Sequence, residues 1–153
     1  MPRLAKNAAD SERWESGNLM LHILVVEDNP LVAKFYRLAL ERAGGFQVTF
    51  TEDVDAILTQ VANSAFDALV LDVSLRNCSF QGRPVDGLEL ARLIRQIPEG
   101  KSLPILLATA HAMEGDRQRL LAASGANAYL EKPIYDPNAL VTKIKEMVGR
   151  QEE

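Results

Sequence analysis

A run of four apolar residues between two aspartates constrains the fold of this chain more than any other feature of the sequence. Residues 68–71 follow Asp67 and lead to Asp72 without a polar residue among them. A strand that is apolar on both faces is typical of a parallel sheet covered by helices on both sides. In such sheets ligands bind beyond the carboxyl ends of the strands, and Asp72 stands at that end. The run alone does not establish a site, because aspartates also commonly end strands and cap helices.

Strand and helix signals alternate along the rest of the chain. Five times in succession, a short apolar run is followed by a longer stretch with apolar residues at helical spacing. The predicted strands are residues 21–26, 46–50, 67–72, 104–109 and 126–130, and the predicted helices are residues 30–43, 54–63, 87–97, 113–124 and 136–148. This alternation predicts an α/β fold, namely a flavodoxin-like, doubly wound (βα)5 parallel sheet with strand order 2-1-3-4-5.

The composition is that of an ordinary single domain. The chain has 153 residues and a formal net charge of -4, which argues against a broad nucleic-acid or membrane footprint. No apolar run is long enough to span a bilayer, and the first residues lack the apolar core of a signal peptide. The one cysteine, Cys78, excludes an internal disulfide bond. Together these features predict a cytoplasmic protein.

Polar residues stand at the ends of four predicted strands. Glu27 and Asp28 follow the first strand, and Asp72 ends the third. Thr109 ends the fourth strand, and Lys132 follows the fifth. Because the predicted order makes the first and third strands neighbours, we expect the three carboxylates to lie closest together.

Three carboxylates in one place repel each other unless a cation joins them. Ligands that offer only oxygen favour Mg²⁺, with Mn²⁺ as the alternative, and histidine or cysteine pairs at zinc spacing are absent from the sequence. A carboxylate beside Mg²⁺ and a lysine can accept a phosphoryl group. The alternatives for each residue taken alone are a helix-start acid, a strand residue or a solvated charge.

Five short motifs, in this order, resemble the receiver domain of two-component response regulators. They are VVEDNP at residues 25–30, LVLD at 69–72, DGLEL at 86–90, ATA at 108–110 and GANAYLEKP at 125–133. The resemblance extends over residues 21–149, which we expect to be the receiver domain. Residues 1–20 would then be a leader and residues 150–153 a tail.

The resemblance implies a phosphoacceptor rather than an enzyme, with self-catalysed phosphorylation and autodephosphorylation. A histidine kinase or a histidine phosphotransfer protein would phosphorylate Asp72, and the surface of the last two helices and the last strand would then signal to a partner protein. Pro133 would follow a cis peptide bond. The other implied site residues are Glu27 (through water), Asp28, Asp72 and the main-chain carbonyl of Ser74 for the metal, Lys132 and Thr109 for the phosphoryl group, and Thr109 with Tyr129 for the switch.

The chain departs from the family pattern in the loop of residues 73–86, which is about twice the usual length. We interpret it as an irregular segment, either functional or a tolerated surface insertion. Its Arg76, Phe80 and Arg83 could shield the acyl phosphate or contact a partner. We expect Cys78, in the same loop, to be exposed. Outside the loop, His111 is either a residue that tunes the phosphoryl lifetime or a plain surface histidine.

The sequence leaves three hypotheses about the function. The first is a stand-alone receiver, and the second is a receiver module cut from a longer multidomain regulator. The third, a flavodoxin-like cofactor-binding protein, is disfavoured because Glu27 and Asp28 would repel a cofactor phosphate where such proteins have glycines and hydroxyls. No direct contact with nucleic acid or membrane is expected, and the sequence does not decide whether the chain forms a homodimer.

Overall fold

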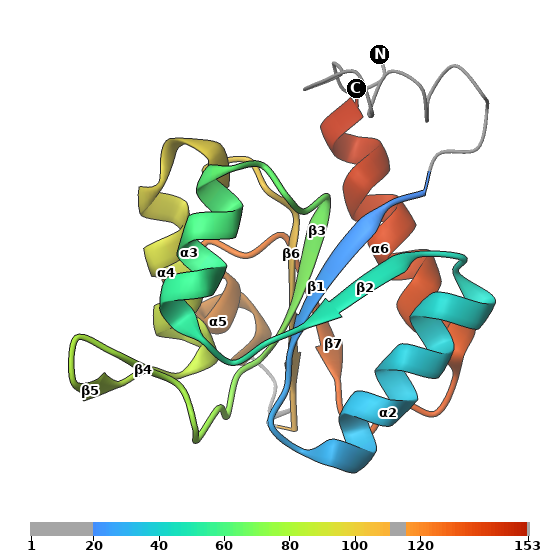
Figure 1. Ribbon diagram of the computed structural model, residues 1–153. Coiled ribbons are helices and arrows are strands. Elements are labelled where there is room, and N and C mark those ends of the chain that lie inside the picture. Colours follow the sequence, from blue (N-terminus) through green and yellow to red (C-terminus); the bar gives the residue numbers. More distant parts are fainter. Residues whose placement is uncertain (1–19, 111–115, 153) are drawn as a thin grey trace.

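Five parallel strands form a twisted central sheet in the computed structural model, which describes residues 20–110 and 116–152, with side chains through residue 149 (Figure 1). The strands are β1 (His22–Val26), β2 (Gln47–Phe50), β3 (Ala68–Asp72), β6 (Ile105–Thr109) and β7 (Ala128–Glu131). Their order across the sheet is β2-β1-β3-β6-β7, which confirms the predicted doubly wound topology.

Helices cover both faces of this sheet (Figure 1). One face carries α2 (Pro30–Leu38), which continues as a π-helical turn (Ala39–Ala43), and α6 (Pro137–Glu152). The other carries α3 (Val54–Ala62), α4 (Gly87–Gln96), a 3-10 turn (Pro98–Gly100) and α5 (Asp116–Ser124). Within the described part of the chain, none of these helices has the length and apolar character needed to cross a membrane.

The last helix ends later than the sequence predicts. α6 continues to Glu152 instead of ending near residue 148, so it takes in most of the predicted tail. The predicted start of the fourth helix at residue 113 lies outside the described residues, as do His111 and residues 1–19 of the predicted leader.

Each inner strand contributes side chains to two separate cores, because successive residues of a strand point to opposite faces. Leu24, Leu69 and Leu107 pack against α3, α4 and α5. Val25 and Val70, one position further along, pack against α2 and α6. Every residue of β3 is buried, as its unbroken apolar run predicts, whereas the residues of β2 at the edge are partly exposed.

Two helix starts bring the chain close to the carboxyl ends of the strands. Asn29 caps α2, since its Oδ1 accepts hydrogen bonds from the amides of Leu31 (3.0 Å) and Val32 (3.3 Å). α4 begins at Gly87, where an added Cβ would collide with the carbonyl oxygen of Asp72. Glycine at this position therefore lets the start of α4 pack directly against the end of β3.

Arg95 of α4 forms hydrogen bonds with the segments that lead into β6 and β7. Its guanidinium donates hydrogen bonds to the carbonyls of Gly125 (2.9 Å) and Leu103 (2.7 Å) and to Asn127 Oδ1 (2.8 Å). The same oxygen of Asn127 accepts from the amide of Ile105 (2.9 Å). These bonds fix the starts of β6 and β7, and therefore also the places where these two strands end.

The loop of residues 73–86 is not irregular throughout, which corrects that interpretation. It contains a short antiparallel hairpin of β4 (Ser79–Phe80) and β5 (Arg83–Pro84). Gln81 (φ 53°) and Gly82 (φ 78°) form its turn, and both lie in the left-handed region. A turn with two positive φ values favours Asn-Gly or Asp-Gly, so the Gln-Gly pair gave a weak signal.

The expectation that Cys78 is exposed was wrong. Only 3% of its surface is accessible, because it packs into the core beneath the hairpin, beside α3 and α4. Its Sγ donates a hydrogen bond to the carbonyl of Glu52 (3.4 Å). Burial, reinforced by the charges of Glu52 and Asp28, raises the pKa of the Cys78 thiol to about 11. The thiol is therefore neutral and part of the packing that holds the hairpin down.

We expect Leu71→Ala to lower the free energy of unfolding by about 2–5 kcal/mol, because this fully buried side chain of β3 would leave a cavity in the core. Leu31→Ala is the matched control, since Leu31 is 80% exposed and should change stability by less than about 0.5 kcal/mol. Urea unfolding followed by circular dichroism measures both. Similar losses in the two variants would contradict the central position of β3.

Candidate functional site

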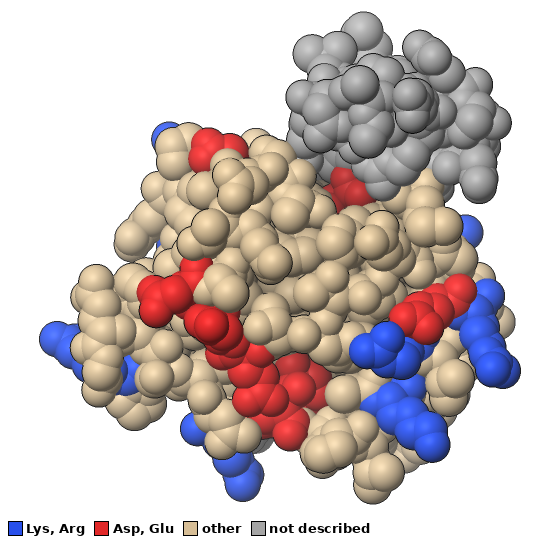
Figure 2. Space-filling view, in the orientation of Figure 1, with Lys and Arg blue, Asp and Glu red and all other residues tan. Residues whose placement is uncertain are grey.

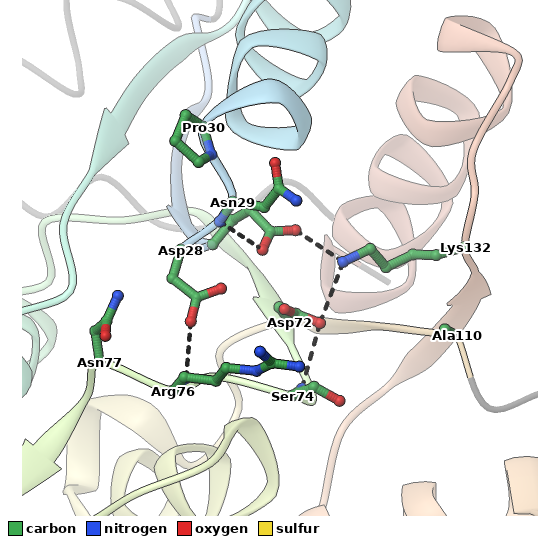
Figure 3. Close-up of a pocket in the computed structure, with 10 residues that line it drawn as sticks. Asp28, Asn29, Pro30, Asp72, Ser74, Arg76, Asn77, Ala110 and Lys132 are labelled. Atoms are coloured by element: carbon green, nitrogen blue, oxygen red, sulfur yellow. Dashed lines mark hydrogen bonds and ion pairs between the residues drawn. The ribbon is translucent and has the colours of Figure 1, made fainter.

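The carboxylates at the ends of β1 and β3 meet at one edge of the sheet (Figure 3). β1 pairs with β3, with Val26 opposite Leu71, so the residues that follow in each strand are neighbours. Glu27, Asp28 and Asp72 each have a carboxylate oxygen within 4.8 Å of the oxygens of the other two. The expectation that these three side chains lie close together is therefore confirmed.

Lys132 joins this cluster from the far side of β6. Its Nζ lies 2.9 Å from Glu27 Oε1 and 3.4 Å from Asp72 Oδ1. The Lys132 amide also donates to the carbonyl of Thr109 (2.8 Å), which fixes the backbone beside the end of β6. The peptide bond from Lys132 to Pro133 is cis, the isomer that the resemblance implies.

Burial and charge act on the acid and the base of this ion pair together. Burial is the largest influence on Glu27 and, with the charge of Asp72, raises the pKa of its carboxyl, while Lys132 acts to lower it. For Lys132, burial disfavours the charged form, but the hydrogen bond to Glu27 and the charge of Asp72 outweigh it and raise the pKa. Lys132 is therefore a firmly charged ammonium facing the end of β3.

Main-chain amides hold one oxygen of each aspartate. The Ser74 amide donates to Asp72 Oδ1 (3.3 Å), and the Arg76 amide donates to Asp28 Oδ2 (2.8 Å). Both aspartates also line the pocket, where their carboxylates can meet a ligand.

The cluster forms the floor of an open pocket of about 470 Å³. Figure 2 shows acidic side chains gathered across the lower part of the molecule, where the strands end, with basic side chains to either side. The residues that line the pocket come from the ends of β1, β3, β6 and β7 and from the loop after β3: Glu27, Asp28, Asn29, Pro30, Asp72, Ser74, Arg76, Asn77, Ala110 and Lys132.

The donor set of this pocket fits Mg²⁺ or Mn²⁺. All three clustered ligands are carboxylates, and no histidine or cysteine belongs to the cluster that the described residues form. Hard divalent cations prefer such oxygen ligands and retain several of their waters. One oxygen of each carboxylate lies within 4.8 Å of the other two, so the residues present suit the metal that the sequence predicts.

The predicted switch residues lie near the pocket but do not line it. Thr109 ends β6 and is fully buried, and Ala110 after it reaches the pocket instead. Tyr129, on β7 opposite Leu107, is half-buried against the core formed with α3, α4 and α5. Their predicted roles, and the metal-ligand role of the Ser74 carbonyl, stay predictions.

Two contributions of the long loop were not predicted in this form. The sequence indicated Arg76 as a side chain that could shield a phosphate, whereas its amide already binds Asp28. Asn77 lines the pocket as well. No sequence signal identifies a main-chain donor of this kind, because any residue except proline can supply it.

Comparison with known proteins identifies, over most of the chain, the family that the sequence motifs resemble. The family model described as "Response regulator receiver domain" matches residues 23–145. The response regulator DivK of Brucella anthropi is 31% identical over 83% of this chain and 95% of its own length. The transcriptional regulatory protein PhoB of Rhizobium meliloti is 37% identical, but the chain spans only 52% of that relative's length.

A solved receiver domain has a similar fold. The receiver domain of a sensor histidine kinase of Pseudomonas aeruginosa is 30% identical and has a TM-score of 0.70, with 86% of this chain and 99% of that chain covered. That structure has a magnesium ion coordinated in its active site cleft.

We expect Asp28→Ala to lower the affinity for Mg²⁺ about tenfold or more, because it removes a carboxylate from a site with few protein ligands. Isothermal titration calorimetry with MgCl₂ measures this. Asp55→Ala is the control, since Asp55 is an exposed aspartate of α3 outside the pocket. An affinity equal to that of the parent would show that Asp28 is not a ligand.

Proposed function

The chain belongs to the response regulator receiver domain family of two-component signalling, and we propose that Asp72 is the residue that accepts the phosphoryl group. The observation that carries this proposal is the position of Asp72 at the end of the central strand. One of its oxygens lies 3.4 Å from Lys132 Nζ, and its side chain lines the pocket.

The proposed reaction is an in-line transfer to Asp72. A carboxylate oxygen attacks phosphorus, the bond from phosphorus to the histidine nitrogen of a partner protein breaks, and the nitrogen keeps the electron pair. Hydrolysis by water later breaks the new phosphorus–oxygen bond and releases inorganic phosphate. Because the group transferred is an anion, the protein's main task is to position it and balance its charge.

Lys132 is placed to balance the negative charge of the phosphoryl group when that group is transferred to Asp72. It lies between Glu27 and Asp72, so a small movement of its ammonium can exchange one carboxylate for phosphoryl oxygens. The Ser74 amide, now bonded to Asp72, is a second donor on the same side. A Mg²⁺ ion held by Asp28, Asp72, the Ser74 carbonyl and, through water, Glu27 would supply further positive charge beside the phosphoryl oxygens.

We propose Thr109 and Tyr129 as the switch that follows phosphorylation. The Thr109 hydroxyl would move toward the phosphoryl group and vacate space that the Tyr129 ring enters from the next strand. This movement would alter the surface formed by α5, β7 and α6, where a partner can distinguish the two states. Phosphorylation shifts the balance only as far as it favours one arrangement over the other.

The partners of this receiver follow from its chemistry. A histidine kinase or a histidine phosphotransfer protein would supply the phosphoryl group, and a downstream protein would bind the switched surface in the cytoplasm. The DivK relative is matched over nearly its whole length, which supports a receiver that acts alone at residues 21–149. The chain spans only 52% of the PhoB relative, so a module of a larger regulator is the alternative.

We expect the chain to gain one phosphoryl group when it is incubated with MgCl₂ and acetyl phosphate, and Asp72→Asn to gain none, because the amide is not a nucleophile for phosphorus. Intact-mass spectrometry measures the uptake, and hydroxylamine should release it from the parent. Asp55→Asn serves as the control and should match the parent. Equal uptake by Asp72→Asn would refute the assignment.

We expect Thr109→Ala to accept phosphate at Asp72 but to lose most of the response of Tyr129, since the coupling hydroxyl is gone. The NMR shifts of the Tyr129 ring should move on phosphorylation in the parent and barely move in the variant. Thr59→Ala, on the exposed side of α3, is the control. Shifts of the same size in Thr109→Ala and the parent would show that the hydroxyl does not couple the site to the surface.

A further inference from the structure

We propose that the Arg76 guanidinium is a second cation for the phosphoryl group, binding its oxygens beside Lys132. The inference rests on the proposed phosphorylation of Asp72 and goes beyond it, because it gives a role to the long loop after β3. It follows from the charge of the pocket, the anchoring of the Arg76 backbone and the direction of its side chain.

The pocket holds more negative than positive charge even before a phosphoryl group enters. Three carboxylates line it, and the described lining residues include two cations, Lys132 and Arg76. Lys132 is already shared between Glu27 and Asp72. The Arg76 guanidinium is exposed and forms no ion pair or hydrogen bond with any residue in the described part of the chain. It is thus the one cation of the described lining that is uncommitted.

The backbone of Arg76 is held at a position from which its side chain reaches into the pocket. Its amide donates to Asp28 Oδ2 at 2.8 Å, which ties the loop to the end of β1. Figure 3 shows the side chain extending from this anchor across the pocket toward Ser74 and Asp72. The arginine therefore spans the pocket from the Asp28 side to the phosphoacceptor side.

The rest of the loop keeps this anchor in place. Cys78, two residues later, is buried in the core. The hairpin that follows closes on itself through the hydrogen bond from the Val85 amide to the Cys78 carbonyl (3.0 Å). The short segment from Arg76 to Cys78 is therefore held at both ends, by the bond to Asp28 and by the buried thiol.

A guanidinium suits a phosphoryl group better than any other side chain would in this position. Its planar fork donates two parallel hydrogen bonds to two oxygens, and it stays charged at all working pH values. Because Arg76 is exposed at the rim of the pocket, it meets the incoming donor before the donor reaches Asp72. We therefore expect it to act mainly on capture of the dianionic donor.

The step in which Arg76 takes part leaves its own bonds unchanged. With acetyl phosphate, an oxygen of Asp72 forms the new bond to phosphorus while the bond from phosphorus to the acetyl oxygen breaks. Acetate leaves with the electron pair. Arg76 keeps its proton and donates hydrogen bonds to two terminal oxygens of the group, before and after the transfer.

The test is the initial rate of phosphorylation of the full chain by acetyl phosphate at fixed MgCl₂, followed by rapid quenching and intact-mass spectrometry. We expect Arg76→Ala to lower the second-order rate constant about tenfold, as the loss of a charge-assisted pair of hydrogen bonds implies. Arg76→Lys should retain part of the rate, since it keeps the charge but not the fork. Added salt should reduce the difference in rate constant between the parent and Arg76→Ala, because salt screens the charge of Arg76.

Two controls separate this role from a structural one. Arg83→Ala removes an exposed arginine of the same loop, on β5 and outside the pocket, and should match the parent. The affinity of Arg76→Ala for Mg²⁺ should also match the parent, because alanine keeps the amide that binds Asp28.

The inference is overturned if Arg76→Ala and Arg83→Ala have equal rates, or if Arg76→Ala loses affinity for Mg²⁺ by the same factor as it loses rate. Uptake by the parent at Asp72 with no effect of Arg76→Ala would overturn this inference alone. A parent that takes up no phosphoryl group would refute the proposed function as well.

Discussion

The ion pair between Lys132 and Glu27 holds together a site that would otherwise repel itself. Three carboxylates lie within 4.8 Å of one another at the edge of the sheet, partly out of water. Charges of one sign at such distances cost several kilocalories per mole in a partly buried setting. Lys132, which follows β7 and stands 105 residues after Glu27 in the sequence, offsets that cost. The order of the strands is therefore what makes this cluster of acids tolerable.

The sequence predicted the site residues whose positions follow from the geometry of the sheet. Asp72 ends an apolar run, and Glu27 and Lys132 follow two others, so their meeting follows once the strand order is known. The Asn29 side chain caps α2, and Gly87 lets α4 pack against the end of β3; both short-range patterns are also visible in the sequence. Rules of local pattern and of topology point to the same fold here, which makes it predictable.

The parts that the sequence did not predict depend on contacts made only in the folded chain. Burial of Cys78 results from the way the loop after β3 folds under its own hairpin, and no periodicity signals it. The turn at Gln81 uses a residue that seldom marks such turns. The bond from the Arg76 amide to Asp28 involves a group that every residue but proline has. Tertiary packing decides each of these, which leaves little for sequence reasoning to detect.

The hairpin in the loop after β3 leaves the body of the protein and returns to it at nearly one place. The amide of Val85 binds the carbonyl of Cys78, and the amide of Gly87 binds the carbonyl of Val73. Whatever lies between Cys78 and Val85 can therefore vary in length without moving the start of α4. The tip at Gln81 and Gly82 does not line the pocket, so it is a suitable place to attach a fluorophore or to insert a peptide epitope.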